Sequence, residues 1–99
     1  MRKIGKKEKN EGLYRAILQL RDEEECYEFF QDLCTVGELR SMEQRFEVAS
    51  LLYEGRNYNE ILTKTGASSA TVSRVSRTLN FGTGAYERFF DRMRRGGNA

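Results

Sequence analysis

The chain has 99 residues, a formal net charge of +2, 38% apolar and 32% charged residues, two cysteines and no histidine or proline. A chain of this length forms one domain with a small core, and no run approaches the roughly 18 apolar residues that a membrane-spanning helix requires. The basic start, residues 1–10, lacks the apolar segment of a secretory signal, which predicts a cytoplasmic protein. Without histidine or a Cys-x-x-Cys pair, no metal site is expected.

Charge is distributed unevenly along the chain. Residues 1–10 carry five bases and one acid, residues 11–55 carry four bases and eleven acids, and residues 56–99 carry eight bases and three acids. Basic segments attract nucleic acid and acidic ones repel it, so the pattern predicts one DNA-facing surface formed by the basic segments at both ends of the chain. We expect residues 1–10 to be a flexible basic arm and residues 96–99 a disordered tail.

Helical periodicity predicts a single all-α domain over residues 11–95. The first helix, from about Glu11 to Leu20, has a wide apolar stripe, and the second begins after an N-terminal cap formed by Asp22 and Glu25. The second helix is apolar around much of its circumference, with Cys26, Tyr27, Phe29, Phe30, Leu33 and Cys34. One small chain has difficulty covering both helices, which predicts a homodimer; a compact monomeric bundle is the alternative.

A longer helix is expected from a cap at Thr35 and Glu38 to about Glu54, and Gly55 ends it. Its polar residues cover one face and its apolar residues the other. Arg45 lies closer to the apolar side than the other charged residues of this helix do. It is therefore the basic residue of interest in the long helix.

Residues 57–80, which read NYNEILTKTGASSATVSRVSRTLN, predict a helix-turn-helix. Asn57 caps the first helix, and Gly66 supplies the positive φ that a sharp turn between helices requires. The apolar residues are spaced to pack on one another: Ile61 and Leu62 from the first helix, and Val72, Val75 and Leu79 from the second. An FGTG loop at residues 81–84 and a last amphipathic helix over residues 85–95 follow.

The other face of the second helix is small, hydroxylated and cationic. Ser68 or Ser69 can cap this helix, and no acidic residue occurs from Leu62 to Tyr86. Small side chains allow close approach to the DNA major groove, hydroxyl groups reach phosphates, and an arginine can read guanine through two hydrogen bonds. The predicted DNA contacts are Ser68, Ser69, Ala70, Thr71, Ser73, Arg74 and Arg77. A helical hairpin whose polar face is simply solvated is the alternative.

The run from Glu25 to Gly82, ECYEFFQDLCTVGELRSMEQRFEVASLLYEGRNYNEILTKTGASSATVSRVSRTLNFG, resembles the Trp repressor superfamily. The similarity is greatest to its YerC/YecD-type, TrpR-related members of Gram-positive bacteria. The resemblance implies a Trp-repressor-like helical bundle that forms an intertwined homodimer. It also implies interlocked N-terminal helices and two helix-turn-helix heads directed at successive major grooves.

The same resemblance bears on an effector. In the Trp repressor, two arginines and a small residue form a tryptophan pocket, and Arg45 and Arg74 match those arginines by position. The next residue is a glycine in that repressor and Val75 in this chain, and a valine fills the space that an indole needs. The candidate effector pocket is therefore Arg45, Arg74 and Val75, and tryptophan is not expected as a cofactor.

Together, these patterns predict a sequence-specific DNA-binding transcriptional regulator, repressor-like, that acts as a homodimer on double-stranded DNA. The alternative is a dimeric protein-interaction module built on a helix-turn-helix scaffold, without direct DNA readout. Its docking face would be the acidic body, residues 11–55. An enzyme is not expected, because histidine is absent and the cysteines lie on an aromatic helix.

Overall fold

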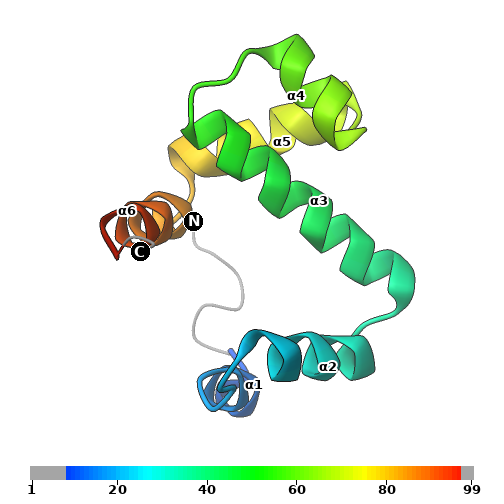
Figure 1. The fold of residues 1–99 in the computed structure, drawn as a ribbon, viewed down its shortest axis with the longest axis vertical. Coiled ribbons are helices and arrows are strands. Elements are labelled where there is room, and N and C mark those ends of the chain that lie inside the picture. The colour runs from blue at the N-terminus through cyan, green and yellow to red at the C-terminus, as the bar shows by residue number, and fades with distance from the viewer. Residues whose placement is uncertain (1–8, 97–99) are drawn as a thin grey trace. The chain divides into compact units, whose positions relative to one another are not determined.

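The computed structural model describes residues 9–96, which form six α-helices and no strand (Figure 1). The helices are α1 (Glu11–Ile17), α2 (Glu23–Leu33), α3 (Val36–Tyr53), α4 (Tyr58–Thr65), α5 (Ser69–Phe81) and α6 (Ala85–Gly96). The predicted all-α class is therefore confirmed over these residues, and none of their helices has the length and apolar character needed to cross a membrane. Residues 1–8 and 97–99 lie outside the described range, so the predictions of a flexible arm and a disordered tail stay predictions there. The predicted bounds were too wide, because Asn10 caps α1 and Gly96 is the last residue of α6.

The chain divides into two compact units, one that ends at Val36 and one that begins at Gly37. In the first unit, neither α1 nor α2 contains a buried residue. The prediction that the first helix reaches Leu20 was wrong, because α1 ends at Ile17. Its last turn tightens: the amides of Gln19 and Leu20 donate to carbonyls three residues back, a pattern that does not continue an α-helix.

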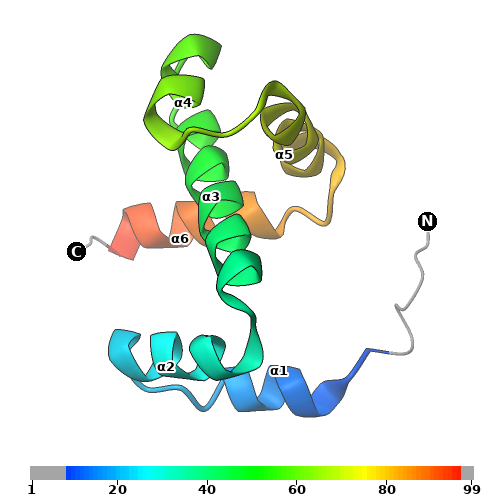
Figure 2. The same ribbon diagram turned by 90° about the vertical axis from the view of Figure 1, so that its right-hand side faces the viewer.

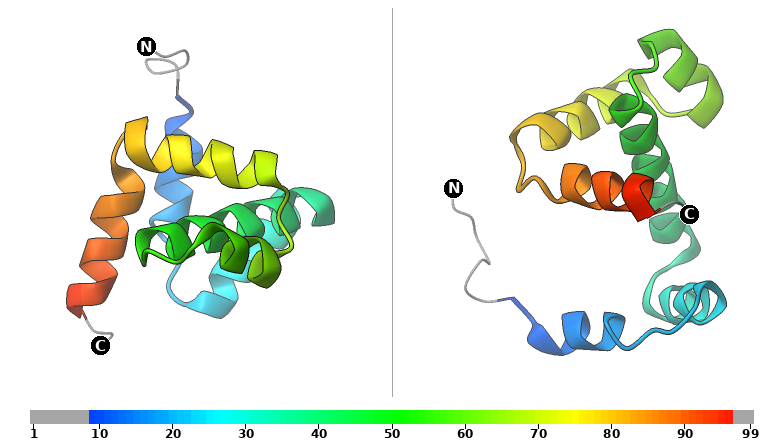
Figure 3. Two further views of the ribbon diagram at one scale, coloured as in Figure 1. Left: turned by 90° about the horizontal axis from the view of Figure 1, so that it is seen from above. Right: turned by 60° about the vertical axis from the view of Figure 1, so that its left-hand side comes forward.

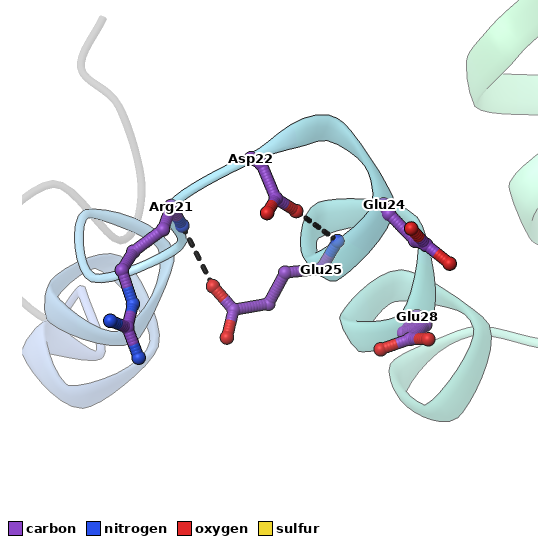
Figure 4. Close-up of a pocket in the computed structure, with 5 residues that line it drawn as sticks. All are labelled: Arg21, Asp22, Glu24, Glu25 and Glu28. Carbon is purple, nitrogen blue, oxygen red and sulfur yellow. Dashed lines mark hydrogen bonds between the residues drawn. The ribbon is translucent and has the colours of Figure 1, made fainter.

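The predicted cap of α2 is confirmed. The Asp22 carboxylate accepts a hydrogen bond of 2.8 Å from the Glu25 amide, and the Glu25 carboxylate accepts one of 2.8 Å from the Arg21 amide (Figure 4). With Glu24 and Glu28, these residues line a small acidic recess at the start of the helix. Carboxylates near a helix N-terminus are stabilised by the helix dipole, which accounts for the acidic cluster without a ligand.

The core of the second unit joins α3 to α4, α5 and α6. Its buried residues are Val48, Ala49, Leu51, Ile61, Ala67, Val72, Val75 and Phe90. The side chains of Val48, Ile61 and Val72 have no exposed area. All four helices, and the turn between α4 and α5, therefore contribute to one apolar cluster. This cluster holds α5 against the other helices of the second unit.

As predicted, Gly55 ends α3. Its φ of +82° turns the chain, its amide donates to the Leu52 carbonyl, and the Arg56 amide donates to the Leu51 carbonyl. These two bonds satisfy carbonyl groups that the end of a helix otherwise leaves unpaired. Residues 54–57 then connect α3 to α4, and α4 and α5 lie beside the C-terminal part of α3 (Figure 1).

An aromatic cluster holds α6 across α3 (Figure 2). The ring centroid of the buried Phe90 lies 5.3 Å from that of Phe46 and 5.1 Å from that of Tyr53. The Tyr53 hydroxyl donates to the Asp91 carboxylate, and this hydrogen bond raises the pKa of Tyr53 above its ordinary value. The Arg94 guanidinium lies 5.1 Å from the centre of the same ring, a cation–π contact. The helix that follows α5 is thus anchored to the body as well.

Candidate nucleic-acid interface

The segment from Asn57 to Phe81 consists of two short helices and a turn. The Asn57 side chain accepts a hydrogen bond of 2.8 Å from the Glu60 amide, which starts α4 as predicted. Gly66, with φ +71°, ends α4 in the left-handed conformation that favours glycine. Of the two candidate caps for α5, the structure uses Ser68, whose hydroxyl accepts from the Thr71 amide at 3.1 Å.

The end of α5 lies one residue beyond the predicted boundary. Phe81 is the last helical residue, and Gly82 is the position where the chain leaves the helix. A Cβ atom on Gly82 would lie 2.5 Å from the Thr78 carbonyl oxygen, so the backbone passes there too closely for any side chain. The chain reverses at residues 82–84 between α5 and α6 (right-hand view of Figure 3).

One side of α5 packs on the core. Val72 is fully buried and Val75 is 3% exposed, and both belong to the cluster that contains Ile61. Leu79, the third member of the predicted stripe, is only half-buried. The apolar contacts therefore fasten the first half of α5 most firmly, which is the half that carries most of the predicted DNA contacts.

The other side of α5 faces away from the core. Five of the predicted contact residues are exposed there: Ser69, Ala70, Ser73, Arg74 and Arg77. Ser68 is exposed and Thr71 half-buried, and the Ser68 hydroxyl donates to the Thr71 hydroxyl at 3.1 Å. These two hydroxyl groups are thus already engaged in the cap, so the exposed arginines and Ser73 are the stronger candidates for contacts with a ligand.

Some arginines among residues 9–96 pair with carboxylates, and others, including both arginines of α5, do not. Arg15, Arg40 and Arg56 form ion pairs with carboxylates, and Arg56 pairs with Glu60 at 2.6 Å. Within residues 9–96, neither Arg74 nor Arg77 takes part in an ion pair. Their guanidinium groups are therefore available for an anionic partner such as phosphate.

The candidate effector residues lie in different environments. Val75 belongs to the core, whereas Arg45 and Arg74 are exposed. A side chain that is 3% exposed fills core volume and does not line an open cavity. That these three residues form an effector pocket, and that tryptophan is not the effector, therefore stay predictions.

Two polar contacts of this segment were missed by the sequence reasoning. The Gln44 side-chain amide of α3 donates to the Thr65 carbonyl at 3.2 Å, and the Tyr58 hydroxyl donates to the Ser69 carbonyl at 3.2 Å. Gln44 and Thr65 are 21 residues apart. No periodicity or cap pattern pairs such residues, so only the folded structure identifies the contact.

Comparison with known proteins identifies the family. The model of the Trp repressor protein family matches residues 8–94, which is most of the chain. The chain belongs to the Trp repressor family. This is a family of non-enzymatic DNA-binding regulators, so the chain is not an enzyme, and the superfamily predicted from the Glu25–Gly82 run is confirmed.

Individual relatives agree with the family assignment. The uncharacterized protein YerC of Bacillus subtilis (strain 168) is 56% identical over 82 residues, which are 83% of this chain and 79% of that protein. A TrpR-like protein from Eubacterium eligens ATCC 27750 has a crystal structure that matches with a TM-score of 0.84 and 52% identity over 90% of this chain and 92% of that one. A putative Trp repressor from Staphylococcus aureus matches with a TM-score of 0.88 and 44% identity over 94% and 96% of the two chains. The Trp-repressor-like fold is therefore shown.

Proposed function

We propose that this chain is a sequence-specific transcriptional regulator, repressor-like, that binds double-stranded DNA through α4 and α5 as a helix-turn-helix. The observation that carries the proposal is the outer face of α5, where Ser73, Arg74 and Arg77 are exposed and both arginines lack an ion pair within residues 9–96. A helix with small and cationic residues on its outer face fits the major groove. Membership of a family of DNA-binding regulators supports the proposal.

The proposed active form is a homodimer. Helices α1 and α2 bury no residue, and Tyr14, Leu18, Tyr27 and Leu33 are 43 to 80% exposed. In the second unit, Phe46, Phe89 and Met93 are also 43 to 52% exposed. A second copy related by a two-fold axis would cover such surfaces and would present two recognition helices to two half-sites.

The alternative function is a dimeric protein-interaction module that docks through acidic side chains and does not read DNA. The acid-rich start of α2 favours this second candidate, although capping and the helix dipole already account for those carboxylates. The two functions differ in how binding responds to salt. Each phosphate that the protein neutralises contributes about 0.9 to the slope of log affinity against log salt concentration.

A salt titration is therefore the test of the proposed function. We expect the affinity for a labelled duplex, measured by fluorescence anisotropy between about 50 and 200 mM salt, to fall steeply, with a slope of several units. The control variant, whose salt slope is compared with that of the wild type, is Arg92→Ala. It removes one exposed charge from α6 without altering α5. Absence of duplex binding at low salt would contradict the proposal and leave protein docking as the remaining candidate.

We propose further that tryptophan is not an effector. Val75 is packed into the core beside Arg74, so adding L-tryptophan is expected to leave the affinity for DNA unchanged. Isothermal titration calorimetry should detect no stoichiometric binding to the wild-type chain. The converse variant, Val75→Gly, opens the space and tests whether the valine is the obstacle. Tight tryptophan binding by the wild type would show that the packing argument fails.

A further inference from the structure

The Gln44 side chain links α3 to the turn of the proposed helix-turn-helix. Its amide nitrogen donates to the Thr65 carbonyl oxygen at 3.2 Å, and both residues are half-buried. Thr65 is the last residue of α4, so its carbonyl is one of those that the helix leaves without an intrahelical partner. Gln44 therefore satisfies a helix-terminal carbonyl from a separate element.

Thr65 is itself the centre of the turn. Its hydroxyl donates to the Ile61 carbonyl at 2.8 Å and accepts from the Ala67 amide at 3.1 Å. A displacement of Thr65 would move the backbone on both sides of Gly66 and, with it, the start of α5. The contact from Gln44 thus acts on the residue that joins the two helices.

At the other end of α4, a second tether reaches α5 directly. The Tyr58 hydroxyl donates to the Ser69 carbonyl at 3.2 Å, which connects the first residue of α4 to the first residue of α5. The apolar contacts of Ile61 with Val72 and Val75 hold the helices together but have little directional preference. Hydrogen bonds are directional, so the two tethers select one angle among those that the apolar contacts permit.

We propose that Gln44 is a positioning residue for DNA recognition, which sets the direction of α5 relative to α3 through the Thr65 carbonyl. The inference rests on the proposed function, because direction matters only if two α5 helices must reach two half-sites at a fixed separation. Half-sites of helix-turn-helix dimers lie about 34 Å apart, one turn of DNA. A rotation of each α5 relative to its α3 changes that separation while leaving the contacts of a single α5 intact.

The test measures preference for half-site spacing. The probes are duplexes that carry two copies of the half-site recovered from random DNA, with their separation varied by single base pairs. The variants are Gln44→Met, which keeps the length of the side chain without its donor, and Gln44→Glu, which places a carboxylate against the Thr65 carbonyl. The matched control for the charge change is Gln31→Glu, because Gln31 is exposed on α2. Circular dichroism tests whether each variant is folded.

Both Gln44 variants should bind the preferred spacing about three- to tenfold more weakly, the effect expected for one lost hydrogen bond, and should discriminate less between spacings. Their affinity for a single half-site should stay at the wild-type value, which a general loss of structure would not allow. If Gln44→Glu does not fold, Gln44→Met decides alone; if neither folds, Tyr58→Phe tests the same positioning through the second tether. If the folded variants discriminate between half-site spacings as the wild type does, the role proposed for Gln44 is overturned, but the proposed function is not. A wild-type chain that showed no sequence-specific binding would overturn the proposed function itself.

Discussion

Replacing Arg77 by alanine should relax the base preference at one position of each half-site, whereas replacing Arg74 should weaken binding evenly on all sequences. Both side chains are exposed on α5, three residues apart, and so project from neighbouring parts of its surface. By helical spacing, Arg77 lies more nearly opposite the buried Val72 and Val75 than Arg74 does, so we expect Arg77 to be freer to reach base edges. A bidentate arginine discriminates in favour of guanine by about 1 to 3 kcal/mol, whereas a phosphate contact contributes roughly one unit to the salt slope.

Competition binding with a set of single-base variants of the half-site, at two salt concentrations, separates the two roles. Arg77→Lys is the matched control, since it keeps the charge and loses the fork that binds guanine through two hydrogen bonds. It should therefore lose discrimination but keep its salt slope. The reverse assignment of effects would mean that α5 is rotated by about a sixth of a turn about its axis. Small, equal effects from both alanine variants would favour the protein-docking alternative.

The second expected result is that the chain is a stable homodimer whose thermal midpoint rises with protomer concentration. Neither α1 nor α2 buries a residue within one chain, and Leu18 is 80% exposed. If association buries this surface, folding and association are coupled and mass action makes stability depend on concentration. Sedimentation equilibrium at micromolar concentration should then give twice the mass of one chain.

A variant pair makes this prediction sharper. Leu18→Ala removes an exposed apolar side chain and should have little effect, within about 0.5 kcal/mol, on an isolated chain. In a dimer that covers α1, the same change should lower stability by about 2 kcal/mol or more, as for a buried leucine. Gln19→Ala, at the exposed neighbouring position, is the control and should be neutral in both cases. A folded monomer at micromolar concentration would contradict both the dimer and the two-headed arrangement on DNA.

Local chemistry accounts for the elements that could be predicted from the sequence. Asp22 and Asn57 cap their helices as expected, because a short polar side chain and a following amide lie within one helical turn. Gly55 and Gly66 end their helices at positive φ, which few other residues adopt without strain. The outer face of α5 follows in the same way, since helical spacing alone decides which side chains oppose the buried valines.

Contacts between elements far apart in the chain could not be predicted in this way. The bond from Gln44 to Thr65 and that from Tyr53 to Asp91 depend on how α3 packs against the later helices. The early end of α1 was missed because its apolar periodicity continues past the last helical residue. The bond from the Ser68 hydroxyl to the Thr71 hydroxyl was also missed, and contact of Thr71 with DNA stays a prediction. Each case depends on packing or on competition between hydrogen bonds.

Selection of bound sequences from random duplex DNA at two salt concentrations tests whether the chain recognises DNA sequence through α5. We expect one sequence family to be enriched at both concentrations and to consist of two half-sites related by a two-fold axis. Their centres should lie about 10 base pairs apart, one turn of the double helix, or at a multiple of that distance. Enrichment should be sharper at the higher salt concentration, where non-specific binding is weaker. If no sequence is enriched at either concentration, the assignment of sequence-specific recognition to α5 is contradicted.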